Sequence, residues 1–208
     1  MVKKQHSKSY LEVEIDNVRI KELFSLEIKI ETDRLIIRPF EKEDYENWYA
    51  EYENRRPSQY KYDDGRPSDM PSSTFDWFCE WIEGFNKAAN NDEMYQYGVF
   101  RKEDGVNVGK VELFKILRLD YQWAMMGYSI HNQYWHMGYG SESVSATKEW
   151  VFKNLGFQRI ELHINTDNLP SIRLAEKNGF KLECTREKFA FENGEWTDFL
   201  IYYQLCNS

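Results

Sequence analysis

The chain has 208 residues and a formal net charge of −8, with 35 acidic against 27 basic side chains. Its length predicts one ordinary domain with its own core, and its acidic balance argues against a nucleic-acid binder, which normally carries a basic face. No stretch approaches the roughly 20 apolar residues of a membrane helix, and no apolar segment follows the first residues as in a secretory signal.

The cysteines indicate the compartment. Cys79, Cys184 and Cys206 are odd in number, scattered, and contain no Cys-x-x-Cys pair. This pattern predicts a reducing compartment, with no structural zinc or other metal. We therefore expect a cytoplasmic protein without a membrane or nucleic-acid partner.

The N-terminal residues are set apart from the rest. Residues 10–30 alternate in places between apolar and polar side chains and turn at Asp16-Asn17, which predicts a short hairpin-like extension. No linker, internal repeat or low-complexity tract follows. We therefore expect an N-terminal β extension at residues 1–30 and one domain at residues 31–208.

The first half of the domain alternates helices, a loop and strands. Four aromatic residues at helical spacing predict a buried helix face over residues 45–52. The stretch 54–73 contains three prolines and is typical of a loop. Apolar residues at helical spacing predict a second helix over residues 74–90. Strands are expected near residues 95–101, 107–114 and 123–131.

A glycine-bearing loop follows the last of these strands. Residues 136–140 lead directly into an amphipathic helix over residues 141–155, which Gly156 is placed to end. N–H groups at a helix start point outward with the positive end of the dipole, and glycine lets an anion approach the backbone. The sequence therefore predicts a pyrophosphate site at this loop.

The last quarter predicts a strand, a short helix and a hairpin. Residues 159–165 alternate as a strand, and the following helix has Pro170 in its first turn and ends at Gly179. Asn168 can cap this helix. Two strands around the turn at residues 192–195 complete the chain as an antiparallel hairpin.

The order of these motifs resembles the GNAT family of acyl-CoA N-acyltransferases. The resemblance covers about residues 31–205, and residues 31–40 look like the family's first strand, which Pro39 ends. It implies an α/β (α+β) fold: a single domain with a central mixed, mostly antiparallel twisted sheet flanked by helices. The wording Gly-Tyr-x-Ile…Tyr-Trp-x-x-Gly-Tyr-Gly-x-Glu is similar to the branch that contains the ribosomal-protein N-terminal acetyltransferases. The motifs are Ala124-Met125-Met126-Gly127-Tyr128-Ser129-Ile130-His131, Gln133-Tyr134-Trp135-His136-Met137-Gly138-Tyr139-Gly140-Ser141-Glu142-Ser143, Arg159 to Asn168, and Leu169 to Phe180.

The resemblance implies acetyl-CoA as cosubstrate and a set of residues to bind it. The pyrophosphate would lie on the loop, and the pantetheine amides would pair with a strand edge at Ile130 and His131. Asn168 and Ser171 match the family's Asn-x-x-Ser near the pantetheine arm, although helix capping explains both residues equally simply. The loop residues are His136, Met137, Gly138, Tyr139, Gly140 and Ser141.

The residues that would move protons depart from the family pattern. Many members carry a base five residues before the asparagine, and here that position is His163, which strand alternation turns away from the apolar side. A neutral imidazole is a suitable proton acceptor, but a histidine in a sheet can equally be structural. Glu112 is a second base candidate, or a solvent-facing strand residue. Ala175 replaces the tyrosine that many members use as acid, which leaves Ser171, Tyr128, Tyr202 and Tyr203.

These observations predict an N-acetyltransferase that moves an acetyl group from acetyl-CoA directly to a primary amine in a ternary complex. The acceptor would be a protein N-terminus or a small amine. Aminoglycosides, polyamines and amino acids remain alternatives, as does a catalytically silent acyl-CoA-binding protein, because Ala175 and Met125 replace polar groups. The missing third glycine, and the lack of an acidic residue that closes a βαβ unit at the usual spacing, argue against a Rossmann protein. The sequence leaves open whether the chain forms a homodimer.

Overall fold

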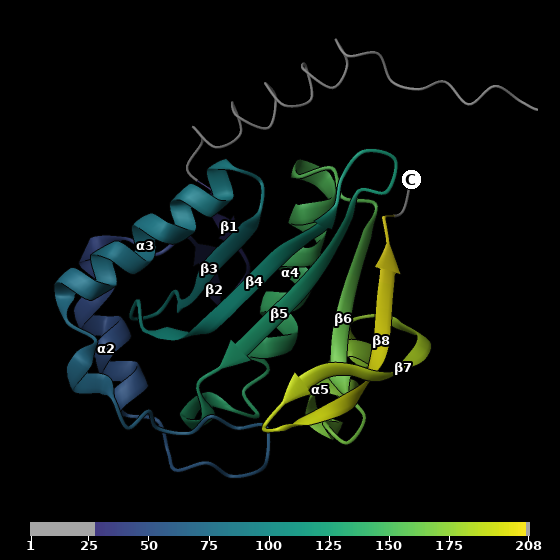
Figure 1. Ribbon diagram of the computed structural model, residues 1–208. Helices are drawn as coiled ribbons and strands as arrows, with labels where there is room; N and C mark the ends of the chain where they lie inside the picture. Colours follow the sequence, from purple (N-terminus) through teal and green to yellow (C-terminus); the bar gives the residue numbers. More distant parts are fainter. Residues whose placement is uncertain (1–27, 207–208) are drawn as a thin grey trace, which may run out of the picture.

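A computed structural model describes residues 28–206 and contains one eight-stranded sheet (Figure 1). The strand order is β1-β2-β3-β4-β5-β6-β8-β7, and every neighbouring pair is antiparallel except β5 and β6. This confirms the mixed, mostly antiparallel sheet. The strands are β1 (Ile30–Glu31), β2 (Leu35–Arg38), β3 (Met94–Arg101), β4 (Asn107–Leu117), β5 (Trp123–Ile130), β6 (Arg159–Asn165), β7 (Lys181–Glu192) and β8 (Glu195–Leu205).

Helices cover both faces of the sheet. On one face, α2 and α3 pack an aromatic cluster with Ile36 and Phe100 of the first strands, whereas α4 and α5 pack against the larger core on the other face. Ile37 and Val99, the sequence neighbours of those two residues, belong to the larger core, as strand alternation requires. The helices are α2 (Tyr45–Glu53), α3 (Phe75–Asn90), α4 (Tyr139–Asn154) and α5 (Leu169–Lys177).

Local chemistry sets the helix ends. Thr74 caps α3 by accepting a hydrogen bond from the Trp77 N–H, and Asn168 caps α5 through the Ser171 N–H. Gly156 follows α4 with a φ of 68°, a conformation that glycine adopts at little cost. The helices that the sequence predicted are therefore confirmed, with α4 starting two residues earlier than expected.

The first strand differs from the prediction. Residues 31–40 do not form one strand, because a turn at residues 32–34 separates β1 from β2. The Thr32 hydroxyl closes this turn by accepting a hydrogen bond from the Leu35 N–H at 2.8 Å. Most of the expected N-terminal hairpin lies outside the described residues. Within residues 28–206, no helix is long and apolar enough to cross a membrane.

Candidate active site

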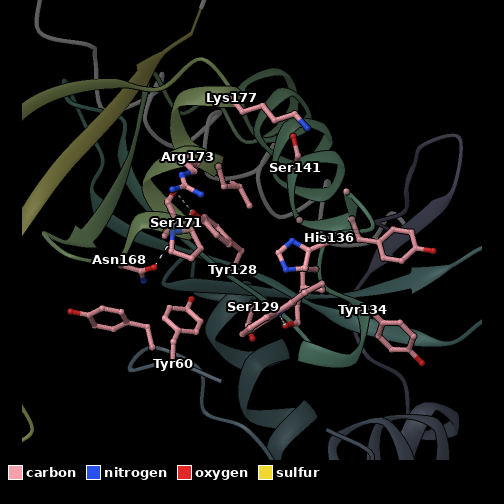
Figure 2. Close-up of a pocket in the computed structure, with 18 of the residues that line it drawn as sticks. Tyr60, Tyr128, Ser129, Tyr134, His136, Ser141, Asn168, Ser171, Arg173 and Lys177 are labelled. Atoms are coloured by element: carbon pink, nitrogen blue, oxygen red, sulfur yellow. Dashed lines mark hydrogen bonds between the residues drawn. The ribbon is translucent and has the colours of Figure 1, made fainter. Parts of the chain in front are cut away.

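A gap in the sheet marks the site. The parallel strands β5 and β6 pair only over Trp123–Met125 and Arg159–Glu161, after which they diverge. The edge of β5 beyond Met125 therefore faces an opening instead of a neighbouring strand. A cavity of about 600 Å³ lies at this opening, between α4 and α5 (Figure 2).

The glycine loop forms one wall of the cavity. His136 has a φ of 65° and Gly138 a φ of 84°, so two left-handed residues turn the backbone just before α4 begins at Tyr139. The first N–H groups of any α-helix have no partner within the helix. Those of α4 start beside Gly138, Tyr139, Gly140 and Ser141, which all line the cavity. This wall can accept an anion.

The opposite wall comes from α5 and supplies positive charge. Ser171, Arg173 and Lys177 line the cavity from this helix, and Asn168 lines it from the N-cap position. Neither basic side chain forms an ion pair with a carboxylate in the described part of the chain. Sequence reasoning missed both, although their i, i+4 spacing places them on one face of α5.

A hydrogen bond spans the gap from β5 to α5. The Tyr128 hydroxyl lies 2.7 Å from the Ser171 Oγ, and both residues line the cavity. Burial raises the pKa of Tyr128 to about 12, so its hydroxyl stays protonated in neutral solution. Together the two hydroxyls form a neutral proton-donating pair at the cavity wall.

Residues 54–73, which we call the strap, close another side of the cavity. The strap leaves α2 and reaches the loop before α5 (Figure 1), where Tyr62 and Lys61 donate hydrogen bonds to Asp167. Tyr60 and Tyr62 line the cavity. Sequence reasoning placed this loop correctly but did not identify these tyrosines as cavity residues.

His163 lies on the sheet face opposite to α5. Its Nε2 is 2.8 Å from the Glu161 Oε2, and its ring packs edge-on against Phe189. Glu161 is 1% exposed and also pairs with Arg159 and Arg186. Burial raises the pKa of Glu161, but hydrogen bonds from His163 and Arg159 outweigh this effect and hold that pKa below its usual range. A neutral imidazole that donates from Nε2 to this carboxylate has its acceptor lone pair on Nδ1.

Of the other predicted site residues, some line the cavity and others lie away from it. Glu112 pairs with Lys110 at 2.7 Å on the face that also carries α2 and α3. Tyr202 is buried and bonds to Glu176, outside the cavity lining. Met137 is exposed and does not line the cavity, whereas Ile130 does.

The His131 side chain points away from the cavity. Its ring accepts a hydrogen bond from Arg55 Nε at 2.8 Å and lies 3.1 Å from Asn107 Oδ1. Its backbone N–H donates to the Val108 carbonyl and its carbonyl accepts from the Tyr134 N–H, so both groups already have partners within the fold. Ile130 and His131 are adjacent in an extended segment and therefore face opposite sides.

Comparison with known proteins places this geometry in one family. The family model described as acetyltransferase (GNAT) domain matches residues 34–181. The probable N-acetyltransferase YjcK of Bacillus subtilis (strain 168) is 32% identical over 120 residues, which span 58% of this chain and 66% of that protein. The match therefore covers just under two thirds of the length of YjcK.

Two further proteins match over more of their length. The uncharacterized N-acetyltransferase YoaA of the same organism is 28% identical over 173 residues, which span 83% of this chain and 94% of that protein. The solved structure of RimJ from Mycobacterium smegmatis in complex with CoA-disulfide has the same fold. Its TM-score is 0.68 at 18% identity, covering 82% of this chain and 81% of that one.

The chain belongs to the GNAT acetyltransferase family, because the family model matches well over half of its residues. It is accordingly an acetyl-CoA-dependent N-acetyltransferase. The predicted family, fold and reaction class are confirmed.

The buried His131 predicts a loss of stability in acid. Burial, with the nearby charges of Arg55 and Lys110, lowers its pKa from 6.5 to about 3. Between these values the unfolded chain binds a proton that the folded chain does not, so stability falls as the pH drops below 6.5. We expect this residue to remove about 2 kcal/mol from the free energy of unfolding between pH 7 and pH 5.

Denaturant unfolding of the wild type and His131→Gln at both pH values measures this effect. The wild type should lose about 2 kcal/mol more than the variant over this interval. Equal losses in the two proteins would contradict the assignment, whatever their absolute stabilities.

Proposed function

We propose that the protein transfers an acetyl group from acetyl-CoA to the α-amino group of a protein N-terminus or to a small primary amine, within a ternary complex. One observation carries the proposal: a single cavity joins the first turn of α4 to the unpaired edge of β5. The first feature suits a pyrophosphate and the second suits the amides of an extended pantetheine arm.

The proposed cofactor contacts follow the cavity walls. The pyrophosphate would bind the backbone from His136 to Ser141, and Arg173 and Lys177 would offset its charge. The pantetheine would run along β5 between Met126 and Ile130, past Asn168. This path would bring the thioester to the point where β5 and β6 diverge.

The chemistry needs one proton acceptor and one proton donor. The neutral amine nitrogen attacks the thioester carbonyl carbon, a tetrahedral intermediate forms, and the C–S bond breaks to give an amide and the CoA thiolate. His163 Nδ1 would take the proton that the amine loses, directly or through one water. Tyr128 and Ser171 would supply a proton to the thiolate. Because a thiol pKa is near 8.5, the thiolate needs little help to leave.

The acceptor follows from amine chemistry. A lysine side chain is neutral in roughly one molecule per thousand at pH 7, whereas an α-amino group is neutral in about one in ten. Among the described residues no carboxylate lines the cavity, and the proposed base His163 is an imidazole outside that lining, so the site would lack a strong base for a lysine-like amine. An α-amino acceptor fits this site better than a polyamine or an aminoglycoside.

Thiol release from acetyl-CoA against a panel of peptides, amino acids, polyamines and aminoglycosides tests this proposal. We expect turnover with α-amines, and mass spectrometry of peptides that contain both amines should find the acetyl group on the α-nitrogen. Preferential labelling of lysine or polyamines would overturn the acceptor assignment. CoA binding without turnover on any amine would favour the catalytically silent alternative.

Substitutions at Gly140 test the pyrophosphate site. A Cβ at this position would lie 3.0 Å from the Leu174 Cδ1, the end of a flexible side chain, so Gly140→Ala should reduce CoA affinity only slightly. Gly140→Asp adds a negative charge beside the proposed pyrophosphate and should weaken binding by about 100-fold or more. Calorimetry on folded variants measures both affinities. Similar affinities for Ala and Asp would contradict an anion site here.

Variants of His163 test the proposed base. Both His163→Ala and His163→Gln should lower kcat by about 100-fold near pH 7, a usual effect of losing a general base. Acetyl-CoA affinity should change little, and the acidic limb of the kcat/KM profile should disappear or move. The glutamine retains a donor for Glu161 but cannot accept a proton. Near-normal turnover of the glutamine variant would therefore make His163 a structural residue.

A further inference from the structure

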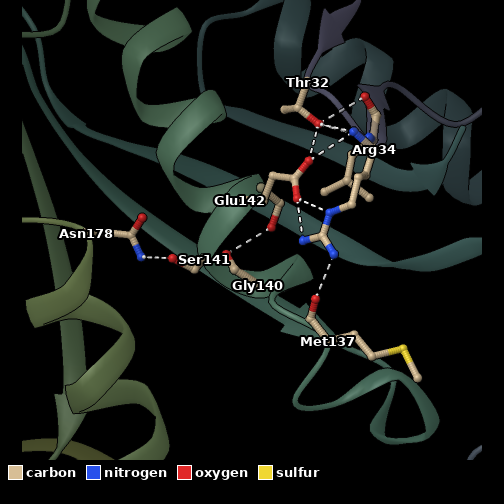
Figure 3. A network of polar contacts seen from close by, with 9 residues as sticks. Thr32, Arg34, Met137, Gly140, Ser141, Glu142 and Asn178 are labelled. Atoms are coloured by element: carbon tan, nitrogen blue, oxygen red, sulfur yellow. Dashed lines mark hydrogen bonds and ion pairs between the residues drawn. The ribbon is translucent and has the colours of Figure 1, made fainter.

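Residues of the turn between β1 and β2 form hydrogen bonds and an ion pair with the start of α4 and the loop before it (Figure 3). Arg34 donates from Nε to the Glu142 Oε2 at 2.7 Å, and its Nη2 lies 2.6 Å from the same oxygen. Thr32 donates its hydroxyl to the other carboxylate oxygen at 2.5 Å. A third donor of Arg34, Nη1, bonds to the Met137 carbonyl oxygen at 2.9 Å. Glu142 and Met137 do not line the cavity, so these contacts support the loop from behind.

The contact with Met137 orients the next amide. A trans peptide is planar, and its C=O and N–H point in opposite directions. Arg34 holds the Met137 carbonyl outward, so the Gly138 N–H is directed the other way, toward the cavity side of the loop. Rotation of this one peptide would present a carbonyl oxygen to an incoming anion. The guanidinium thus keeps the positive end of the Met137–Gly138 peptide dipole toward the proposed pyrophosphate site.

The contact with Arg34 compensates the negative charge of the Glu142 carboxylate. This carboxylate lies in the first turn of α4, where a negative charge suits the helix dipole but repels a bound pyrophosphate. Although burial raises it, hydrogen bonds from Thr32 and Arg34 hold the pKa of Glu142 below its usual range, so the group stays ionised. Arg34 supplies the compensating charge.

We infer that Arg34 and Thr32 are positioning residues for CoA, and that Arg34 is the more important of the two. This inference rests on the proposed cofactor site. Arg34 does not line the cavity and acts on the loop from behind, through its bonds to Met137 and Glu142 and with its guanidinium carbon 4.8 Å from the Tyr139 ring centroid. Its loss should therefore alter the binding of CoA and leave the chemistry of acyl transfer unchanged.

Calorimetry with CoA and steady-state kinetics on Arg34→Met and Arg34→Lys test the inference. Because a hydrogen bond to a charged group contributes enough for a tenfold change, we expect Arg34→Met to raise the Kd of CoA and the KM of acetyl-CoA by about tenfold or more. The KM of the amine and kcat should stay within about twofold. Arg34→Lys keeps the positive charge but not the planar set of guanidinium donors, so its loss of CoA affinity should be smaller than that of Arg34→Met.

A double variant separates the two effects of Arg34. The variant Arg34→Met/Glu142→Gln lacks the carboxylate that Arg34→Met leaves without a compensating charge, so part of the lost CoA affinity should return. The CoA affinity that does not return measures the effect of losing the hydrogen bond to the Met137 carbonyl oxygen. Lys42→Met is the control, because Lys42 forms an exposed ion pair with Glu83 on the far side of the sheet. Its CoA affinity should equal that of the wild type.

The outcomes distinguish this inference from the proposed function. Arg34 is half-exposed and exposed ion pairs contribute little to stability, so the variant should fold, which its thermal midpoint and circular dichroism will verify. If the wild type binds CoA and folded Arg34→Met binds it within twofold, the inference is wrong and the proposed function stands. If the wild type binds no CoA, the proposed function fails with it. Equal falls in kcat and affinity would indicate general loosening of the fold and would also overturn the inference.

Discussion

The divergence of β5 and β6 is the constraint on which the site depends. Three residue pairs join the strands, and beyond Met125 the edge of β5 has no strand beside it. A buried backbone N–H or C=O without a partner costs about 1–3 kcal/mol, so this edge must meet solvent, side chains or a ligand. Trp135 satisfies one such group by donating its indole N–H to the Ile130 carbonyl. The cavity is therefore an opening in the hydrogen-bonding pattern of the sheet, and a pantetheine arm with two amides would complete that pattern.

The start of α4 is fixed from both sides of this opening. Arg34 holds it from the β1–β2 turn, and Asn178, at the end of α5, donates a hydrogen bond to the Ser141 hydroxyl. Dipoles that are fixed before an anion arrives cost no reorganisation when it binds. His136 has a left-handed φ of 65° just before this anchored turn, a conformation that few non-glycine residues adopt. The anchors therefore preorganise the first turn of α4, whose N–H groups have no partner within the helix.

Local patterns predicted the elements, but long-range contacts decided the roles of side chains. Helical spacing, Gly156 and Asn168 were sufficient to place α3, α4 and α5, because caps and periodicity act within a few residues. The bond between Arg34 and Glu142 joins residues 108 positions apart, and no local pattern indicates it. For His131 the prediction concerned backbone pairing with pantetheine, and the structure shows that its N–H already donates to the Val108 carbonyl and its carbonyl accepts from the Tyr134 N–H. The pairing with Val108 is a long-range contact that no local pattern indicates.

The proposed donor and acceptor of protons lie on opposite faces of the sheet. Tyr128 bonds to Ser171 on the α5 side, whereas His163 packs against Phe189 on the other side, where α2 and α3 also lie. In a direct transfer the attacking amine and the leaving sulfur are different atoms on the carbonyl carbon, so the proposed roles would place the two proton transfers on different faces of the sheet. The strap is attached near the gap, where Lys61 and Tyr62 donate hydrogen bonds to Asp167, and its Tyr60 and Tyr62 line the cavity. Because loops vary more readily than the sheet and helices that carry them, we propose that the strap contributes most to the choice of acceptor.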